Sequence, residues 1–564
     1  MTSLDIARTL PELCEQNSRS VPDAVAVLDD HGRSHTYASL YAGSLALAQS
    51  LKSLGVGKGD TVALLAPNSV EWIVSAVSCQ MLGAQVAAFH TWVRSRDLDY
   101  LLAHSQASVF LVSDRVGKHS LLEPVKSLIP EVWKSQREGL TCSGYPSLRH
   151  VVVLGDDIPH GAHNWEVLAS EGGHGQISNR VQTAAGESDI AFILYTSGST
   201  ADPKAVPLVH GDMIENGFHI GERMGLTARD KVWLGSPLFW SFGAANALIA
   251  TFSHQATLVL QEQFDAFGAA DQIATAGCTV AYLLPTLVHA LRQVPDIQNL
   301  FTTVRTGLTI GRPDEVLEVI EGLGVAEICN VYGSTETYGN CCVTPHDMPM
   351  ELRINCQGPP LPGVQLRIVD PLTDEVLPAG SEGAIEVCGR TTPGYWKDSD
   401  GTAKVFTADG WYRTGDIGWI DESGSLVFST RDTDMIKTGG INVSPAEVEI
   451  FISSDPRVAE VVVVGAQDPV RGEVVVAFVQ PTPGVVLTEE DVIARCRSEL
   501  ASYKAPRVVH IVKEIPRTAT GKLSRKQLRE SLLQSETGLR TDNFKGSSHI
   551  HSLTEPGPVT RSEQ

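Results

Sequence analysis

The sequence lacks the excess of basic residues that a general nucleic-acid-binding or anionic-membrane-binding protein needs. It has 44 lysine and arginine residues against 66 aspartate and glutamate residues, which gives a formal net charge of −22. Proteins that bind polyanionic surfaces present a basic footprint to them. We therefore expect no nucleic-acid partner, although an acidic chain remains compatible with a local cationic pocket for phosphate.

The ten cysteines lack the spacing of a metal site or a disulfide framework. There is no C-x-x-C pair, and Cys341 and Cys342 are adjacent, which suits neither a routine disulfide nor a zinc site. This usage is typical of a reducing intracellular compartment. The first five residues lack the pattern of a signal peptide, and the last three are not a Ser-Lys-Leu type tripeptide. A cytoplasmic location is therefore expected.

A hydrophobic run long enough to cross a membrane is also missing. The most apolar long stretch, residues 72–93, is interrupted by Gln80, Gln85 and His90. A membrane-spanning helix needs about 20 consecutive, predominantly apolar residues. The stretch instead predicts a buried helix followed by a strand, and no membrane span.

What the sequence does contain is a long alternation of helix and strand patterns. Apolar residues recur at helical spacing in residues 40–54 and 71–82, whereas residues 61–65 and 107–112 have the pattern of buried strands. Residues 118–188 are rich in Gly, Ser and His and indicate a variable connection. The alternation predicts a parallel sheet covered by helices. A length of 564 residues suggests three or four structural units.

The pattern changes near residue 356 and again after residue 431. Short strands separated by Pro and Gly turns indicate a β subdomain in the first of these regions, and a compact α+β pattern follows it. The strands expected in the subdomain are residues 364–369, 383–387 and 425–428. The elements expected after residue 431 are strands 459–465, 473–479 and 508–512 and helices 489–500 and 524–533.

A hydroxyl-rich loop follows the strand expected at residues 190–195. Residues 196–204 read Thr-Ser-Gly-Ser-Thr-Ala-Asp-Pro-Lys. Hydroxyls and backbone N–H groups donate to phosphate oxygens, glycine lets the backbone approach, and lysine adds positive charge. The loop is not a Walker A loop, because no G-x-x-x-x-G-K-[ST] occurs. Taken alone, it is either a triphosphate cradle or a solvated turn.

Two acids and a second lysine are candidates for the same phosphate site. Glu336 follows the apolar strand 328–332, where a carboxylate is well placed to hold Mg²⁺; the alternative is a glutamate in the first turn of a helix. Asp416 is either a ligand of ribose hydroxyls or an ordinary turn aspartate. Lys522 ends a second loop near the C-terminus and would add one more cation. The set predicts a protein that splits ATP to activate another molecule.

In their order along the chain and in their residues, these segments resemble the adenylate-forming superfamily, which includes acyl-CoA synthetases, carrier-loading adenylation domains and firefly luciferase. The resemblance extends over residues 10–533. The segments that carry it are residues 195–204, 237–240, 332–336, 394–396, 411–416, 431–447 and 516–522. It implies two steps: a carboxylate and ATP form acyl-AMP and pyrophosphate, and a thiol then displaces AMP.

The resemblance also implies a role for each matched residue. The β- and γ-phosphates would be held by Thr196, Ser197, Gly198, Ser199, Thr200 and Lys204. The adenylate would be held by Tyr332 on adenine, Thr335 on the α-phosphate, and Asp416 and Arg431 on the ribose. Glu336 would bind Mg²⁺, and Lys522 would bridge the α-phosphate and the incoming carboxylate in the first step only. Lys437 and Asn442 match residues that contact the adenylate, and Gly439 and Gly440 match a segment that lines the pantetheine tunnel.

The fold class that follows is α/β, with a large N-terminal domain of two βα sheets plus a β subdomain, and a small mobile C-terminal α+β domain. The expected boundaries are residues 1–431 and 432–535, with a polar, disordered tail at 536–564. The leading function is an acid–CoA ligase that uses ATP, Mg²⁺ and CoA on a small-molecule carboxylic acid. The alternatives are loading of a separate carrier protein, a luciferase-like oxygenation, and a nucleotide-binding protein without activity.

Several positions depart from the family pattern. The phosphate loop has Ala201 and Ala205 where glycines are usual, and Thr433 stands at the hinge position. Alanine is tolerated where φ stays negative, so a working loop is expected. Trp240 replaces a common histidine near the acid entrance, and the segment Gly307, Leu308 and Thr309 also departs from the pattern. These four residues are the candidates for the acid pocket.

Overall fold

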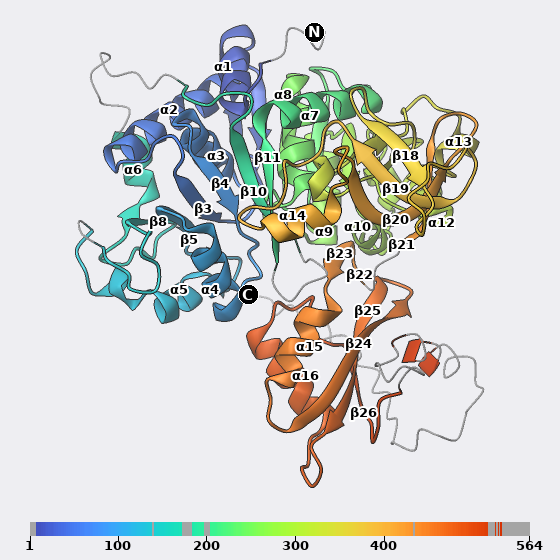
Figure 1. Ribbon diagram of the computed structural model, residues 1–564. Helices are drawn as coiled ribbons and strands as arrows, with labels where there is room; N and C mark the ends of the chain where they lie inside the picture. The colour runs from blue at the N-terminus through green and yellow to red at the C-terminus, as the bar shows by residue number, and fades with distance from the viewer. Residues whose placement is uncertain are drawn as a thin grey trace, which may run out of the picture.

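The computed structural model describes residues 7–137, 140–171, 183–196, 203–431, 435–516, 525, 528–529 and 531–532. A large N-terminal domain contains two βα sheets and a β subdomain, and a small C-terminal α+β domain lies below it in the view of Figure 1. The α/β fold class is therefore confirmed.

The first sheet is mainly parallel and has antiparallel strands at both edges. Among the described residues its strand order is β17-β16-β15-β14-β12-β13-β1-β2. Only β2 and β17 run antiparallel to their neighbours. The strands are β1 Val25–Leu28, β2 Ser34–Thr36, β12 Lys231–Leu234, β13 Thr257–Leu260, β14 Val280–Leu283, β15 Thr306–Thr309, β16 Glu327–Tyr332 and β17 Cys342–Val343.

The second sheet is also mainly parallel, but only one of its edge strands, β11, is antiparallel to its neighbour, because β9 runs parallel to β8. Its order is β11-β10-β4-β3-β5-β8-β9 in the part of the chain that the structure describes, and the β10–β11 pair is antiparallel. The strands are β3 Thr61–Leu65, β4 Gln85–Ala88, β5 Val109–Ser113, β8 His150–Leu154, β9 His163–Asn164, β10 Ile190–Thr196 and β11 Lys204–Val209. A separate short hairpin is formed by β6 Arg115–Val116 and β7 His119–Ser120.

Strand β3 explains why the sheets are covered on both faces. Val62 and Leu64 belong to the core that joins the inner faces of the two sheets, whereas Ala63 and Leu65 belong to the core on the outer face of the second sheet. Side chains alternate along a strand, and all five residues of β3 are buried, so this strand buries both faces. The first sheet has an outer core of its own.

The helices of the large domain are distributed over these three cores. The helices of the inner core are α1 Leu10–Ser20, α2 Tyr37–Ser53, α3 Val70–Met81, α6 Trp165–Glu171, α7 His210–Met224, the π-helix η5 Phe242–Ala247 and α8 Leu248–Ser253. The second sheet's outer face carries α4 Ser95–Ser105, α5 Leu122–Leu128 and η2 Pro130–Trp133. The first sheet's outer face carries α9 Ala266–Ala276, α10 Pro285–Leu291, α11 Ile297–Leu300, α12 Pro313–Leu317 and η6 Glu318–Gly322.

The β subdomain and the small domain complete the fold. The subdomain is an antiparallel sheet of β18 Gln365–Val369, β19 Gly383–Cys388, β20 Tyr412–Ile420 and β21 Leu426–Arg431. The remaining short helices of the large domain are η7 Thr335–Thr337, α13 Met350–Arg353 and α14 Ser399–Val405. The small domain consists of β22 Ile436–Thr438, β23 Ile441–Val443, α15 Pro445–Ser453, β24 Val458–Asp468, β25 Gly472–Pro481, α16 Glu489–Glu499 and β26 Val508–Ile511. Of the helix expected at 524–533, residues 525, 528, 529, 531 and 532 are described and helical, and the others lie outside the described residues.

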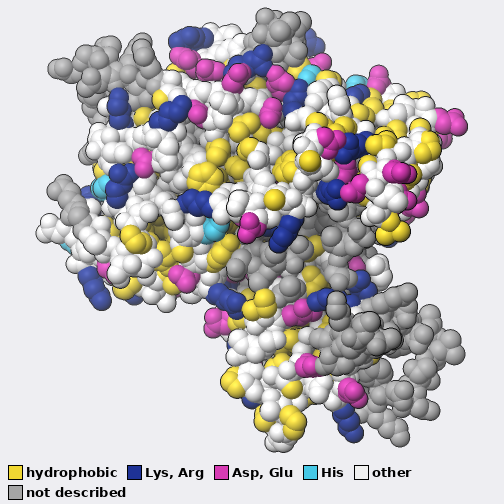
Figure 2. All heavy atoms as spheres, in the orientation of Figure 1, with side chains coloured by type: hydrophobic (Ala, Val, Ile, Leu, Met, Phe, Trp, Pro, Cys, Tyr) yellow, Lys and Arg dark blue, Asp and Glu magenta, His cyan; other side chains and the backbone are white. Residues whose placement is uncertain are grey.

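The surface agrees with the charge balance of the sequence. On the face shown in Figure 2, acidic and basic side chains are interspersed over both domains, with no broad basic patch. Among the described residues, no helix is both long and apolar enough to cross a membrane.

Gly307 occupies a position in β15 that has no room for a side chain. A Cβ atom at this position would overlap the carbonyl oxygen of Ala281 on the neighbouring strand. Overpacking a buried site costs about 1–3 kcal/mol and occasionally more, and here the obstacle is backbone. We expect Gly307→Ala to lower the free energy of unfolding by about 3 kcal/mol, measured by urea-induced unfolding.

The matched control is Gly43→Ala in α2. Outside the backbone of its own helix, a Cβ at Gly43 would have its nearest neighbour, the Cγ2 of Val74, at 4.0 Å. Glycine is a poor helix former, so this variant is expected to be neutral or stabilised by about 1 kcal/mol. Equal stability of the two variants would contradict the packing described for β15.

Candidate active site

The candidate phosphate loop connects two strands that pair with each other. Thr196 ends β10 and Lys204 begins β11, and these two residues are register partners in the antiparallel pair. The hairpin therefore holds both ends of the loop at one edge of the second sheet. Ser197, Gly198, Ser199 and Thr200 lie outside the described residues.

Lys204 and Glu336 are joined through a tyrosine. The Lys204 ammonium donates to the Tyr395 hydroxyl at 3.2 Å and lies 4.5 Å from the centroid of its ring. The same hydroxyl donates to Oε1 of Glu336 at 2.9 Å. Burial, followed by the nearby Glu336 carboxylate, raises the pKa of Tyr395 well above its usual value, so the hydroxyl keeps its proton. Residues 394–396 are among the segments that resemble the adenylate-forming superfamily, but the sequence predicted no role for Tyr395.

The surroundings of Glu336 fit a magnesium ion that is shared with phosphates. The carboxylate is buried, and Oε1 is the oxygen that Tyr395 contacts. Within the described ranges no group of three or more His, Cys, Asp or Glu residues could enclose a metal. Magnesium is usually held by one or two carboxylates together with substrate phosphates rather than by a protein cage. A single buried carboxylate beside a phosphate loop satisfies that requirement.

Tyr332 and Asp416 form a second buried pair. The Tyr332 hydroxyl donates to Oδ2 of Asp416 at 2.8 Å, and its ring stacks on Phe428 with centroids 6.0 Å apart. Burial and the Asp416 carboxylate raise the pKa of Tyr332 well above its usual value. Arg431 is the register partner of Asp416 in the β20–β21 pair, and its side chain is outside the described part. Two candidate adenylate residues from distant segments are thus in direct contact.

The segment that carries Thr335 is held by buried amides. Thr335 Oγ1 lies 3.3 Å from Ser241 Oγ, next to Trp240 in the chain. A few residues on, Tyr338 has a φ of 58°, an unfavourable conformation for a bulky residue. Its carbonyl oxygen accepts from the side-chain amides of Asn246 at 2.9 Å and Asn216 at 3.4 Å. Asn246 is on the π-helix η5, a type of element found frequently at functional sites. Sequence reasoning missed both asparagines, which carry no local motif.

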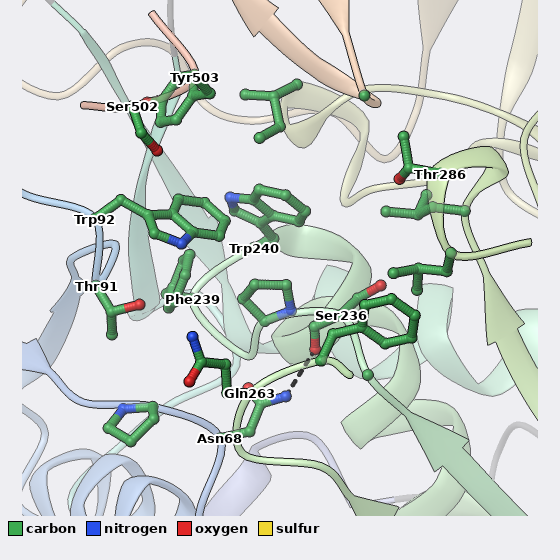
Figure 3. Close-up of a pocket in the computed structure, with 18 of the residues that line it drawn as sticks. Asn68, Thr91, Trp92, Ser236, Phe239, Trp240, Gln263, Thr286, Ser502 and Tyr503 are labelled. Atoms are coloured by element: carbon green, nitrogen blue, oxygen red, sulfur yellow. Dashed lines mark hydrogen bonds between the residues drawn. The ribbon is translucent and has the colours of Figure 1, made fainter. Parts of the chain in front are cut away.

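A cavity of about 680 Å³ lies between the two domains. The large domain contributes Trp92, Phe239 and Trp240 to its lining, and the small domain contributes Gly439 and Tyr503. Figure 3 shows the Trp92 and Trp240 rings near one another, and Asn68, whose amide donates to the Ser236 carbonyl oxygen at 2.9 Å. Of the four acid-pocket candidates, Trp240 lines this cavity. Gly307, Leu308 and Thr309 lie in the buried strand β15 and are not among its lining residues.

The candidate residues of the small domain lie on one hairpin. Lys437 in β22 and Asn442 in β23 are register partners, and Gly439 and Gly440 form the turn between them with φ values of 60° and 82°. A two-residue hairpin turn with both φ values positive favours glycine. A Cβ at Gly439 would lie 3.2 Å from Thr286 of the large domain, so this turn lies close to the large domain. Lys522 lies outside the described residues.

Comparison with known proteins agrees with this arrangement. Residues 14–396 match the family described as AMP-binding enzyme, and residues 447–522 match the AMP-binding enzyme C-terminal domain. The chain belongs to the AMP-binding enzyme family. In this AMP-binding enzyme, the first match contains the phosphate hairpin and Glu336, and the second contains most of the small domain.

Relatives of this AMP-binding enzyme match along nearly its whole length. YngI of Bacillus subtilis, an acyl-CoA synthetase by name, is 32% identical over 94% of this chain and 98% of its own. The mitochondrial medium-chain acyl-CoA ligase ACSF2 of Danio rerio is 28% identical over 93% of this chain and 88% of its own. The structure of the amide bond synthetase McbA from Marinactinospora thermotolerans has a TM-score of 0.79 at 25% identity and covers 93% of this chain and 99% of McbA.

Proposed function

We propose that this AMP-binding enzyme is an ATP-dependent acid–CoA ligase. In the first step a carboxylate oxygen attacks the α-phosphorus of ATP and pyrophosphate leaves, which gives acyl-AMP. In the second step the CoA sulfur attacks the acyl carbon, the thiol proton is lost to water, and AMP leaves. The observation that carries the proposal is the convergence of Lys204, Tyr395 and Glu336 beside the Tyr332–Asp416 pair. Such chemistry depends on positioning and charge neutralisation.

We assign the site residues according to this geometry. The hairpin loop would bind the β- and γ-phosphates, with Lys204 held toward Glu336 by Tyr395. Glu336 would hold Mg²⁺, which when bound neutralises charge on the phosphate oxygens. Tyr332 and Thr335 would contact adenine and the α-phosphate, and Asp416 with Arg431 would bind the ribose. Lys522 would act in the first step. Lys437 and Asn442 would contact the adenylate.

We propose the domain boundaries expected from the sequence, residues 1–431 and 432–535. Gly439 and Trp240 both line the cavity, and Gly440 lies near Leu284, another lining residue. We propose that this arrangement serves the second step, with the cavity admitting the thiol arm of CoA. A rotation of the small domain would convert this second-step arrangement into the first-step arrangement, in which Lys522 would reach the site.

The relatives support CoA as the acceptor. Both sequence relatives described above are named as acyl-CoA synthetases or ligases, and neither name favours loading of a carrier protein. A medium-chain carboxylate is the first acid class to test, because ACSF2 is named for it. All ten cysteines are free thiols, which fits a reducing compartment such as the cytoplasm, whereas ACSF2 is named as mitochondrial.

A panel of acids tests the proposed activation step. Purified protein is incubated with ATP, Mg²⁺ and, in turn, butanoate, octanoate, isovalerate and benzoate, and pyrophosphate is measured. We expect release that depends on the acid and is largest for one class. Pyrophosphate release that does not depend on any acid, or no release while ATP still binds, would contradict acid activation.

Trp240 is expected to limit which acids enter. Its indole lines the cavity and packs against Trp92. Replacing it with glycine removes a large ring, so acids too bulky for the unmodified protein gain access. We expect Trp240→Gly to raise kcat/KM for a bulky acid relative to butanoate by about tenfold or more, measured over the same panel. If Trp240→Gly leaves the ranking of the acids unchanged, Trp240 does not limit which acids enter.

A further inference from the structure

Four aromatic side chains form one wall of the cavity between the domains. They are Trp92, Phe239, Trp240 and Tyr503. The ring centroid of Trp92 lies 5.4 Å from Phe239, 5.4 Å from Trp240 and 5.8 Å from Tyr503. Among the ring contacts of the described residues, Trp92 is therefore the centre of the cluster. Figure 3 shows Trp92 between Tyr503 above and Phe239 below, with Trp240 beside it.

The contact of Trp92 with Tyr503 crosses the domain boundary. Trp92 follows β4 of the large domain, and Tyr503 follows α16 of the small domain. By contrast, Phe239 and Trp240 belong to the same domain as Trp92. A movement of the small domain would remove Tyr503 from one side of the Trp92 ring. It would leave in place the contacts of Trp92 with Phe239, with Trp240 and with His90, whose ring centroid lies 6.2 Å from that of Trp92.

A buried ion pair fixes Tyr503 at this position. The next residue, Lys504, is only 1% exposed, and its Nζ lies 2.7 Å from Glu447 Oε1 and 3.3 Å from Asp97 Oδ1. Glu447 is in the small domain, whereas Asp97 is in α4 of the large domain. Burial alone would lower the pKa of the Lys504 ammonium, but Tyr503, Glu447 and Asp97 together hold it above its usual value. The Asp97–Lys504 contact therefore exists only while the domains are docked in this way.

We propose that Trp92 is a positioning residue that couples docking of the small domain to the orientation of the Trp240 indole. With Tyr503 in place, the Trp92 ring is held on both sides and keeps Trp240 against the cavity wall. When the small domain leaves, Trp92 loses that support, and Trp240 gains freedom to move at the acid entrance. The inference rests on the proposed two-step function, because it assigns the docked arrangement to the second step.

The test measures the two half-reactions of the full-length chain separately. Acyl-adenylate formation is followed as pyrophosphate release without thiol, and the second step is followed as thioester formation from supplied acyl-AMP and CoA. The acid is the member of the panel that the unmodified protein uses best. The variants are Trp92→Ala, Trp92→Phe, Tyr503→Ala and the Trp92→Ala/Tyr503→Ala double variant.

We expect Trp92→Ala to lower kcat/KM for the second step by about tenfold, the scale of losing one or two aromatic contacts. Adenylate formation should stay within about twofold, and Trp92→Phe should recover most of the loss because a ring remains. Adding Tyr503→Ala to Trp92→Ala should lower kcat/KM for the second step by less than a further factor of about two, because the two residues act through one contact.

A second pair of variants tests the docking itself without altering the aromatic wall. Asp97→Asn weakens the contact with Lys504, whereas Asp99→Asn makes the same change on the same helix at a residue that binds Tyr145 within the large domain. We expect Asp97→Asn to slow the second step by about tenfold and Asp99→Asn to change either step by less than about twofold.

Two results would overturn the inference. Equal losses in both half-reactions for Trp92→Ala would indicate a merely structural role, and strictly additive losses for Trp92→Ala and Tyr503→Ala would indicate independent contacts. Either result leaves the proposed function intact, because the unmodified protein still makes thioester. If the unmodified protein forms no thioester from any acid of the panel, the proposed function fails, and this inference fails with it.

Discussion

Replacing Glu336 by glutamine is expected to reduce acid-dependent pyrophosphate release by about 100-fold or more. Glutamine keeps the size of the side chain and an oxygen for the Tyr395 hydroxyl, but it removes the negative charge. The carboxylate is the described group best placed to hold Mg²⁺ beside the phosphate hairpin, since Tyr395 links it to Lys204. Loss of that charge therefore weakens the binding of the metal together with the triphosphate. The measurement is initial rate against magnesium concentration.

The magnesium dependence separates this role from a structural one. If Glu336 holds the metal, Glu336→Gln should require more Mg²⁺ to reach half-maximal rate. The matched control is Glu327→Gln at the opposite end of β16, where the side chain contacts Arg305 and His346. It should leave the rate within about twofold. A normal magnesium dependence in Glu336→Gln would contradict the assignment.

Replacing Lys522 by alanine is expected to separate the two steps. The lysine would neutralise charge on the α-phosphate and on the attacking carboxylate, and removal of one such group costs about 100- to 1,000-fold. That loss should appear in acyl-adenylate formation. Conversion of supplied acyl-AMP and CoA to thioester should stay within about threefold, because we assign the second step to the arrangement in which Gly439 lines the cavity.

The split between the steps is the decisive feature of that variant. Lys504→Ala on the same domain is a useful contrast, because it removes the buried ion pair with Glu447 and Asp97. It should weaken docking and therefore act mainly on the second step. Equal loss in both steps for Lys522→Ala would contradict its role in the first step alone.

Much of the fold could be predicted because strong local patterns were sufficient. The stretch at 61–65, apolar after Thr61, predicted a buried strand, and it is β3, with the same bounds. Residues 71–82 predicted a helix, which begins at Val70, where Ser69 accepts a hydrogen bond from the Trp72 N–H. Such caps and periods are local, so the sequence alone reveals them.

Features that depend on distant partners were missed. Residues 118–188 were interpreted as a variable connection, yet His150–Leu154 is β8, a parallel neighbour of β5. The edge pairs β10–β11 and β16–β17 are antiparallel, which a βα alternation does not predict. A short strand whose neighbours lie far away in the chain carries little signal of its own.

The candidate site shows the same division. The sequence motifs predicted Lys204, Glu336 and Asp416 as site residues, because the residue types themselves indicate their chemistry. It did not identify Tyr395 as the link between the first two, and it assigned Tyr332 to adenine without its hydrogen bond to Asp416. The contacts of Trp92 with Tyr503 and of Asp97 with Lys504 cross the two domains, and no local pattern encodes them.

The most direct test of the acid–CoA ligase is product analysis with and without CoA. The protein, ATP, Mg²⁺ and the best acid of the panel are incubated, and AMP, ADP, pyrophosphate and acyl-CoA are quantified. We predict AMP and pyrophosphate in equal amounts, with one acyl-CoA formed per AMP once CoA is present. Formation of ADP and phosphate, or AMP and pyrophosphate without any acyl-CoA when CoA is supplied, would contradict it.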